Sequence, residues 1–239
     1  VSANTTSGFS IVSYTGNGTG NSTIGHGLGA TPKFIIVKNL TTAQAWGTYS
    51  PSFVSASEPR VLYLNATSSY ANDTNVWGTS AAFNDNTFTV GDWNGSNQSS
   101  SSFIAYCFAE KQGYSKFGSY TGNGNADGTF VYTGFKPAFI MTKNSGYTGN
   151  WVMKDNKRSG TSALQNFGQM NPNQTENPSA NLNNAENKSS AFAVDILSNG
   201  FKMRGVDNAG SNWDGNNYIY MAFAEAPLVG TNGVTAKAR

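Results

Sequence analysis

The sequence predicts an all-β protein built from two tandem jelly-roll or β-sandwich-like units that arose by internal duplication. Three observations predict it: short apolar runs separated by Gly and Asn turns, the lack of a sustained helical period, and a set of landmarks that occurs twice. Hydrophobic residues make up 38% of the chain and aromatic residues 13%, so it has enough apolar surface to fold.

Each half of the chain carries the same landmarks in the same order. A Ser-Tyr-Thr-Gly-Asn-Gly segment comes first, an apolar run ending in Lys-Asn or Thr-Lys-Asn and a tryptophan follow, and a longer apolar run ends in Ala-Glu. The matched pairs are 13–18 and 119–124, 32–39 and 137–144, Trp46 and Trp151, and 103–110 and 218–225. Agreement in order, spacing and chemistry indicates a duplication.

Strands are predicted in order along each half. The Asn-Gly pairs at 17–18 and 123–124 directly follow β-prone stretches, which predicts hairpins there. Apolar runs that follow a proline predict buried strands at 34–37 and 139–142. Further strand signals lie at 61–64, 88–90, 192–196 and 201–204.

The two closing runs, 103–109 and 218–224, place apolar residues on both faces. Such a pattern is typical of a central strand that is covered on both sides. The predicted domains are therefore 1–112 for the first β-sandwich repeat, 113–226 for the second, and 227–239 for an extended C-terminal tail. The Asn-rich stretch 166–190 is predicted to be a surface excursion of the second repeat, and the two tryptophans Trp46 and Trp151 are predicted to be core residues.

Charge and length exclude several classes of protein. The 15 basic and 13 acidic residues are scattered, whereas nucleic-acid binding needs a basic patch, so no nucleic-acid partner is expected. The group Lys154, Lys157 and Arg158 is interpreted as a solvated loop. No apolar stretch is long enough to span a membrane, so no membrane insertion is expected. The chain begins with Val, which suggests a processed or excerpted piece of a longer protein.

The sequence contains few residues that could act as a catalytic base or nucleophile, and no catalytic residue is predicted. His26, the single histidine, lies in a Gly-rich segment and is interpreted as a hairpin-loop residue without a role. Cys107, the single cysteine, lies in an apolar run and is predicted to be a buried structural thiol. Glu110 and Glu225 end the two closing runs and are interpreted as matched ends of equivalent strands. The protein is therefore predicted not to be an enzyme.

A zinc site is excluded, because one His and one Cys cannot supply the usual ligands. No cofactor is predicted, although a calcium ion stays open as an alternative. Four aspartates in Gly- and Asn-rich loops offer the oxygen ligands that calcium prefers: Asp92, Asp127, Asp207 and Asp214. Aspartate in such loops also serves ordinary turn chemistry.

Two loop tryptophans are the candidate ligand-binding residues. Each lies among polar residues before the closing run of its half, and the two segments are Asp92-Trp93-Asn94 and Asn212-Trp213-Asp214. An aromatic face flanked by amides and carboxylates suits a sugar, which stacks on the ring and offers hydroxyls to the polar groups. The alternative is that each ring folds back and caps its sandwich.

Four segments carry a family resemblance: Phe117-Gly-Ser-Tyr-Thr-Gly-Asn-Gly, Gly134-Phe-Lys-Pro-Ala-Phe-Ile-Met-Thr-Lys, Leu197-Ser-Asn-Gly-Phe-Lys-Met-Arg and Tyr218-Ile-Tyr-Met-Ala-Phe-Ala-Glu-Ala-Pro. They resemble an uncharacterised two-repeat, β-rich domain family of virion proteins, common in marine and cyanobacterial bacteriophages. The resemblance covers nearly all of both repeats, and it implies a tail-associated or structural protein. It rests on framework strands and turns and assigns no site residue.

The first hypothesis is therefore a bacteriophage virion structural protein exposed on the particle, as a tail fibre or appendage domain or a capsid decoration. Its expected partners are other virion proteins, copies of itself in a homo-oligomer, and a host-surface glycan. Its expected location is the virion surface. The alternatives are a carbohydrate-binding lectin-like module and a bacterial cell-surface adhesin.

Overall fold

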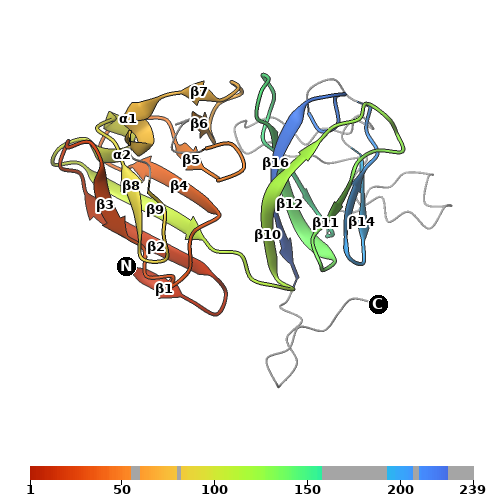
Figure 1. Ribbon diagram of the computed structural model, residues 1–239, viewed down its shortest axis with the longest axis horizontal. Helices are drawn as coiled ribbons and strands as arrows, with labels where there is room; N and C mark the ends of the chain where they lie inside the picture. The colour runs from red at the N-terminus through yellow and green to blue at the C-terminus, as the bar shows by residue number, and fades with distance from the viewer. Residues whose placement is uncertain (55–59, 80–81, 158–192, 207–209, 226–239) are drawn as a thin grey trace. The chain divides into compact units, whose positions relative to one another are not determined.

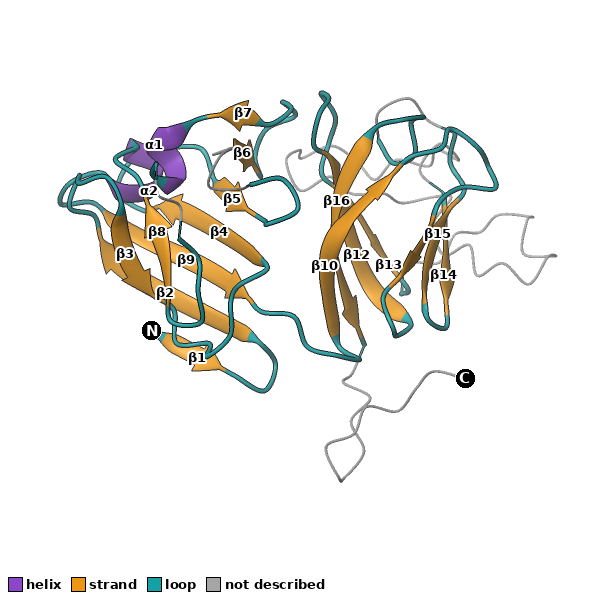
Figure 2. Ribbon diagram, in the orientation of Figure 1, coloured by secondary structure: helices purple, strands orange, loops and turns teal. Residues whose placement is uncertain are grey.

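The computed structural model describes residues 1–54, 60–79, 82–157, 193–206 and 210–225. In these residues the chain is nearly all β, with antiparallel sheets and two one-turn helices, which confirms the predicted all-β class (Figure 2). The chain divides into two compact units, Val1–Lys111 and Gln112–Arg239. The predicted excursion 166–190 and the predicted tail 227–239 lie outside the described residues.

The first unit has a large sheet, a small sheet and both helices (Figure 1). The strands of the large sheet are β1 (Ser2–Asn4), β2 (Phe9–Thr15), β4 (Phe34–Asn39), β5 (Gly47–Tyr49), β6 (Arg60–Tyr63), β7 (Ala71–Asn72) and β9 (Ser102–Phe108). Their order in the sheet is β1-β2-β9-β4-β5-β6-β7. The small sheet pairs β3 (Ser22–Gly25) with β8 (Thr87–Val90), and the helices are α1 (Thr74–Trp77) and α2 (Asn94–Asn97).

The second unit is a sandwich of a four-stranded and a three-stranded sheet. The larger sheet has the order β10-β16-β12-β13, with β10 (Ser115–Thr121), β16 (Asn217–Ala224), β12 (Pro137–Asn144) and β13 (Val152–Asp155). The smaller sheet has the order β11-β15-β14, with β11 (Phe130–Tyr132), β15 (Gly200–Met203) and β14 (Val194–Leu197).

Both units share a nested strand order. In the first, β2 pairs with β9 and β3 pairs with β8; in the second, β10 pairs with β16 and β11 pairs with β15. The two closing strands are central, because β9 lies between β2 and β4 and β16 lies between β10 and β12. This placement confirms the prediction made from their apolar residues on both faces.

The predicted Asn-Gly hairpins are wrong. The strand β2 before Asn17-Gly18 and the strand β3 after it lie in different sheets and do not pair with one another. The same holds for β10 and β11 around Asn123-Gly124. These segments instead cross from one sheet to the other, because a buried asparagine from a distant loop holds them, as described below.

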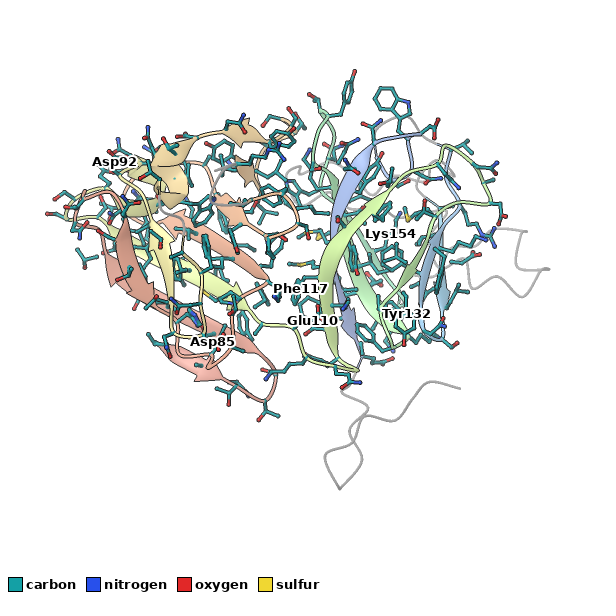
Figure 3. All side chains as sticks on the ribbon, in the orientation of Figure 1. Asp85, Asp92, Glu110, Phe117, Tyr132 and Lys154 are labelled. Atoms are coloured by element: carbon teal, nitrogen blue, oxygen red, sulfur yellow. The ribbon has the colours of Figure 1, made fainter. Side chains whose placement is uncertain are left out.

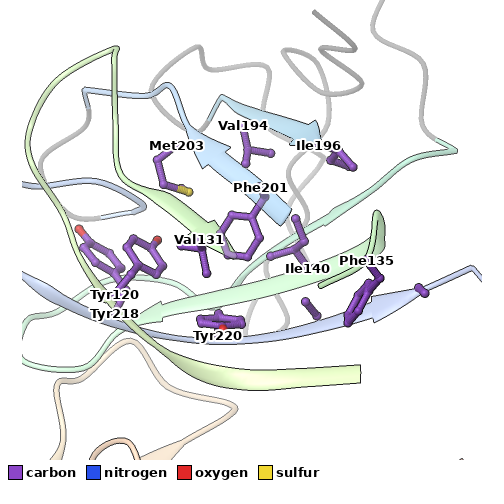
Figure 4. Packing of buried hydrophobic residues seen from close by; sticks show 12 residues of the cluster. Tyr120, Val131, Phe135, Ile140, Val194, Ile196, Phe201, Met203, Tyr218 and Tyr220 are labelled. Atoms are coloured by element: carbon purple, nitrogen blue, oxygen red, sulfur yellow. The ribbon is translucent and has the colours of Figure 1, made fainter. Parts of the chain in front are cut away.

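The core of the second unit lies between its two sheets (Figure 4). Alternate residues of β16 face inward, among them Tyr218, Tyr220 and Ala222. Phe201 from β15 is fully buried and meets the ring of Tyr220 edge-on, with 5.4 Å between ring centroids. The period of two along β16 thus joins both sheets in one apolar layer.

Of the two tryptophans predicted to be core residues, one is in the core and the other is not. Trp151 is 1% exposed and lies in the core, as predicted. Trp46 is only half-buried, and the Nζ atom of Lys38 lies 5.7 Å from its ring centroid. The tryptophan that fills the core of the first unit is Trp77, which is fully buried at the end of α1.

Lys154 is not in a solvated loop (Figure 3). It lies in β13 opposite Ile140 and is 1% exposed, and this burial lowers the pKa of its ammonium group to about 7. Lys157 is exposed, as predicted, and pairs with Glu225. Arg158 lies outside the described residues.

Candidate functional site

A buried asparagine ties together the loops at one end of the first unit. The side-chain amide nitrogen of Asn97 lies 2.9 Å from three oxygens, which belong to the side chain of Asn17 and the main chain of Thr19 and Gly91. Its side-chain oxygen accepts a hydrogen bond of 3.0 Å from the Asn17 backbone nitrogen. The preceding residue, Ser96, accepts a hydrogen bond of 2.6 Å from the Tyr14 hydroxyl.

The second unit repeats this arrangement around Asn212. The amide nitrogen of Asn212 lies 3.0 Å from the Asn123 side-chain oxygen, 2.9 Å from the Asn125 carbonyl and 3.0 Å from the Gly205 carbonyl. The Tyr120 hydroxyl donates a bond of 2.6 Å to Ser211. We call Asn97 and Asn212 the clasp asparagines. Asn212 is fully buried and its side chain holds the fold, so it cannot contact a ligand as the sequence predicted.

The clasp asparagines show which residues of the two units correspond to one another. Trp213 directly follows Asn212, and the residue that directly follows Asn97 is Gln98. Trp93 lies four residues before Asn97. The two candidate tryptophans therefore do not occupy matching places, and each has to be judged by its own contacts.

Trp93 folds back on the first unit. A carbon added at Gly95 would lie about 2 Å from its ring, so the ring lies directly over that glycine. Its ring centroid is 5.5 Å from that of Tyr63, and the ring is half-buried. Asp92 before it is exposed (Figure 3). Asn94 after it is exposed as well. Of the two roles predicted for Trp93, its contacts favour the capping one.

Trp213 stands in a different setting, beside an exposed tyrosine. Its ring meets that of Tyr147 edge-on, with 4.7 Å between centroids, and Tyr147 is 49% exposed. Asp214 follows and is also exposed. At the matching places in the first unit, the Thr42 hydroxyl donates a hydrogen bond of 3.0 Å to the side chain of Gln98. The same position thus carries a polar pair in one unit and an aromatic pair in the other.

The loop that carries Tyr147 is held from beneath by two buried polar side chains. The Asn144 side-chain oxygen accepts hydrogen bonds of 3.1 Å and 3.0 Å from the backbone nitrogens of Gly146 and Tyr147. The Nζ atom of Lys143 donates to the carbonyl oxygens of Asn144 (2.7 Å) and Tyr147 (3.2 Å). Burial of Lys143 lowers the pKa of its ammonium group to about 8. The tyrosine is therefore presented on a fixed backbone.

Tyr147 was not expected from the sequence. The signal lies in the matched segments Lys38-Asn39-Leu-Thr-Thr42 and Lys143-Asn144-Ser-Gly-Tyr147, where an aromatic residue replaces a threonine. Tyr147 thus differs from its counterpart in the first unit at a turn position, and turns are where binding residues are often found.

His26 is buried, which corrects its interpretation as a loop residue without a role. Its Nδ1 accepts a hydrogen bond of 3.2 Å from the Leu28 backbone nitrogen, so Nε2 carries the proton and donates to the Asn84 carbonyl at 3.0 Å. Both ring nitrogens are used to hold the turn. Cys107 is fully buried in β9, as predicted, and burial raises the pKa of its thiol to about 12.

The aspartates proposed for calcium are scattered or already paired. Asp127 binds the ammonium group of Lys202 at 2.5 Å, and this hydrogen bond lowers the pKa of its carboxyl group. Asp207 lies outside the described residues. Within the described part of the chain, no three His, Cys, Asp or Glu side chains gather as a metal site would require.

Comparison with known proteins gives a family. The model of a family described as a domain of unknown function, DUF7483, matches residues 1–227. No curated protein and no solved structure matches the chain. Among the described residues, no helix is both long enough and apolar enough to cross a membrane.

Proposed function

Because the chain belongs to the DUF7483 family, whose function is unknown, we propose its function from its own residues: a structural protein exposed on a bacteriophage particle that contacts a glycan through Trp213 and Tyr147. The observation that carries the glycan contact is the aromatic pair in the loops of the second unit, in which Tyr147 is exposed and Trp213 is half-buried. The virion part of the proposal is supported by the resemblance of the framework segments to virion proteins.

The aromatic pair has the chemistry that a sugar requires. Tyr147 offers a hydroxyl beside an apolar ring, and Trp213 offers the largest apolar face among the side chains. Asp214 directly follows Trp213 in the sequence and is exposed, so it can supply a carboxylate to the ligand. The C–H face of a hexose can therefore rest on the rings while its hydroxyls bind the neighbouring polar groups.

The first unit offers a template for the test. Replacing Tyr147→Thr and Trp213→Gln together gives the second unit the polar pair that the first unit already carries as Thr42 and Gln98. This double variant is expected to fold normally and to lose binding on a glycan array. Trp93→Ala is the matched control in the first unit, and it is expected to retain binding. Equal binding by the double variant and the unchanged protein contradicts the glycan role.

The location is tested separately, with an antibody raised against the chain. Gold labelling of purified phage particles in electron micrographs, in a regular array on a shell or along a fibre, is the expected result. Labelling of bacterial cells that release no phage particles points instead to a cell-surface adhesin and contradicts the virion role.

A further inference from the structure

The strand β11 carries a second exposed aromatic pair, far in sequence from Trp213. Phe130 is 44% exposed and Tyr132 is 63% exposed, while Val131 between them is 6% exposed and points into the core. Residues two apart on a strand face the same side at a spacing of about 7 Å. The outer face of the three-stranded sheet therefore presents two aromatic rings in a row along one strand.

Glycines make room for both rings. A carbon added at Gly200, which lies in β15 opposite Tyr132, would come within 3.1 Å of the Phe130 ring. A carbon added at Gly134 would come within 3.6 Å of the Tyr132 hydroxyl. Each ring therefore lies close to backbone that has no side chain, and the exposed fractions show that much of each ring stays open to solvent.

A network of charged side chains adjoins the aromatic pair. Lys202 is the register partner of Phe130, and its ammonium group binds Asp127 at 2.5 Å. Arg204 joins the same network, because its guanidinium group lies 2.5 Å from Asp195 and 3.3 Å from Asp127. The Asp127 side chain is 76% exposed, so the network offers both donors and acceptors at the surface.

The fold does not require these aromatic residues. In the first unit, the strand β3 takes the place of β11, and Ile24 faces Phe88 as Val131 faces Phe201. The residues on either side of Ile24 are Thr23 and Gly25, and both are exposed. Much of each ring stays exposed in the folded protein, and the first unit has no such pair at the matching places, so the pair is available for binding.

We propose that the outer face of β11 and β15 is a second glycan-binding site, which takes a β-linked oligosaccharide along the strand. Successive sugar rings stack their C–H faces on Phe130 and Tyr132, and their hydroxyls bind Asp127 and Lys202. The strip is narrow and bordered by ion pairs, whereas a protein interface of standard size has a broad apolar core from which charged residues are depleted. A sugar chain fits this chemistry better than a protein surface.

The test uses the full chain with cellohexaose and chitohexaose as probes. The double variant Phe130→Thr/Tyr132→Thr uses threonine because Thr23 stands beside Ile24 in the first unit. Threonine also favours a β-strand, so the strand is kept at both places. We expect at least about tenfold weaker binding by calorimetry, which is about 1.4 kcal/mol, with an unchanged thermal unfolding transition. Backbone amide signals of β11 and β15 are expected to shift when sugar is added to the unchanged protein.

The matched control is Tyr147→Thr/Trp213→Gln. If this variant still binds the hexasaccharides, the β11 site works without Tyr147 and Trp213. Loss of binding at one site can then be distinguished from loss of binding at the other. Three results overturn the proposal: no binding of either probe to the unchanged protein, equal binding by the β11 double variant, or a self-association in sedimentation experiments that the β11 double variant abolishes.

Discussion

The Nζ atom of Lys143 donates a hydrogen bond of 3.2 Å to the carbonyl oxygen of Tyr147, four residues further along the chain. Lys143 is fully buried, so its ammonium group is a support beneath the exposed ring and not a surface charge. The contact makes Lys143 one of the two buried side chains that fix the backbone of the Tyr147 loop, together with Asn144.

Lys143→Met is expected to loosen this loop while leaving the sheet intact. Methionine fills a similar volume and donates no hydrogen bond. Hydrogen exchange at the Gly146 and Tyr147 amides is expected to become faster, and glycan affinity is expected to fall. Lys38→Met is the matched control, because Lys38 donates to the Gln44 carbonyl in the first unit. Unchanged exchange at both amides contradicts the supporting role.

The stability of the second unit is expected to rise between about pH 8 and pH 9.5. Burial lowers the pKa of Lys154 to about 7 and that of Lys143 to about 8, from 10.5 in the unfolded chain. Over this range the unfolded chain binds more protons than the folded one, so raising the pH favours folding, by up to about 1.4 kcal/mol per pH unit for each lysine.

Hydrogen exchange read by mass spectrometry measures this slope in each unit separately. Lys154→Met is expected to reduce the slope in the second unit, because the variant has one fewer buried lysine whose pKa differs between the folded and unfolded chain. A second unit whose stability is flat or falls over this range contradicts the lowered pKa of the two buried lysines.

Asn212→Ala and Asn97→Ala are each expected to destabilise their unit by about 2–4 kcal/mol, because several buried backbone groups lose their partner. Chemical denaturation measures the loss. Asn94→Ala is the control, since the Asn94 side chain is exposed and its replacement is expected to change the free energy of unfolding by less than about 0.5 kcal/mol. A clasp variant as stable as this control contradicts the role of the clasp asparagines.

Cys107 is expected to resist alkylation in the folded protein. It is fully buried, and its pKa of about 12 leaves almost no thiolate at pH 8. Iodoacetamide labelling at pH 8 is expected to proceed only after denaturant unfolds the first unit. Rapid labelling without denaturant places the thiol at the surface and contradicts the structure.

Local patterns predict much of this fold. The apolar runs of β4, β9, β12 and β16 are visible without knowledge of their partners, because burial on both faces leaves a mark on each strand by itself. The partner of β3 is β8, a strand far along the chain, and no local pattern reveals that pairing. An Asn-Gly pair therefore predicts a hairpin where the chain in fact changes sheets.

Only part of the candidate site can be predicted, because the sequence shows single residues and not their partners in space. Trp213 and Asp214 stand out as an aromatic and a charged residue in a polar loop, whereas Tyr147 is noticeable only by comparison with Thr42 of the first unit. The burial of Asn212 could not be foreseen, because an asparagine in a polar loop gives no local sign that it binds one nearby carbonyl oxygen and two oxygens almost ninety residues away.

Each clasp asparagine draws segments from separate parts of its unit onto one amide group. Because these hydrogen bonds hold the end of the unit together, the loops that begin there can differ in sequence and length without unfolding it. Doubling the length of such a loop costs only about 0.6 kcal/mol in closure entropy. The scaffold is thus suited to grafting, because a loop beyond a clasp asparagine can be lengthened at little cost in stability while the sheets stay as they are.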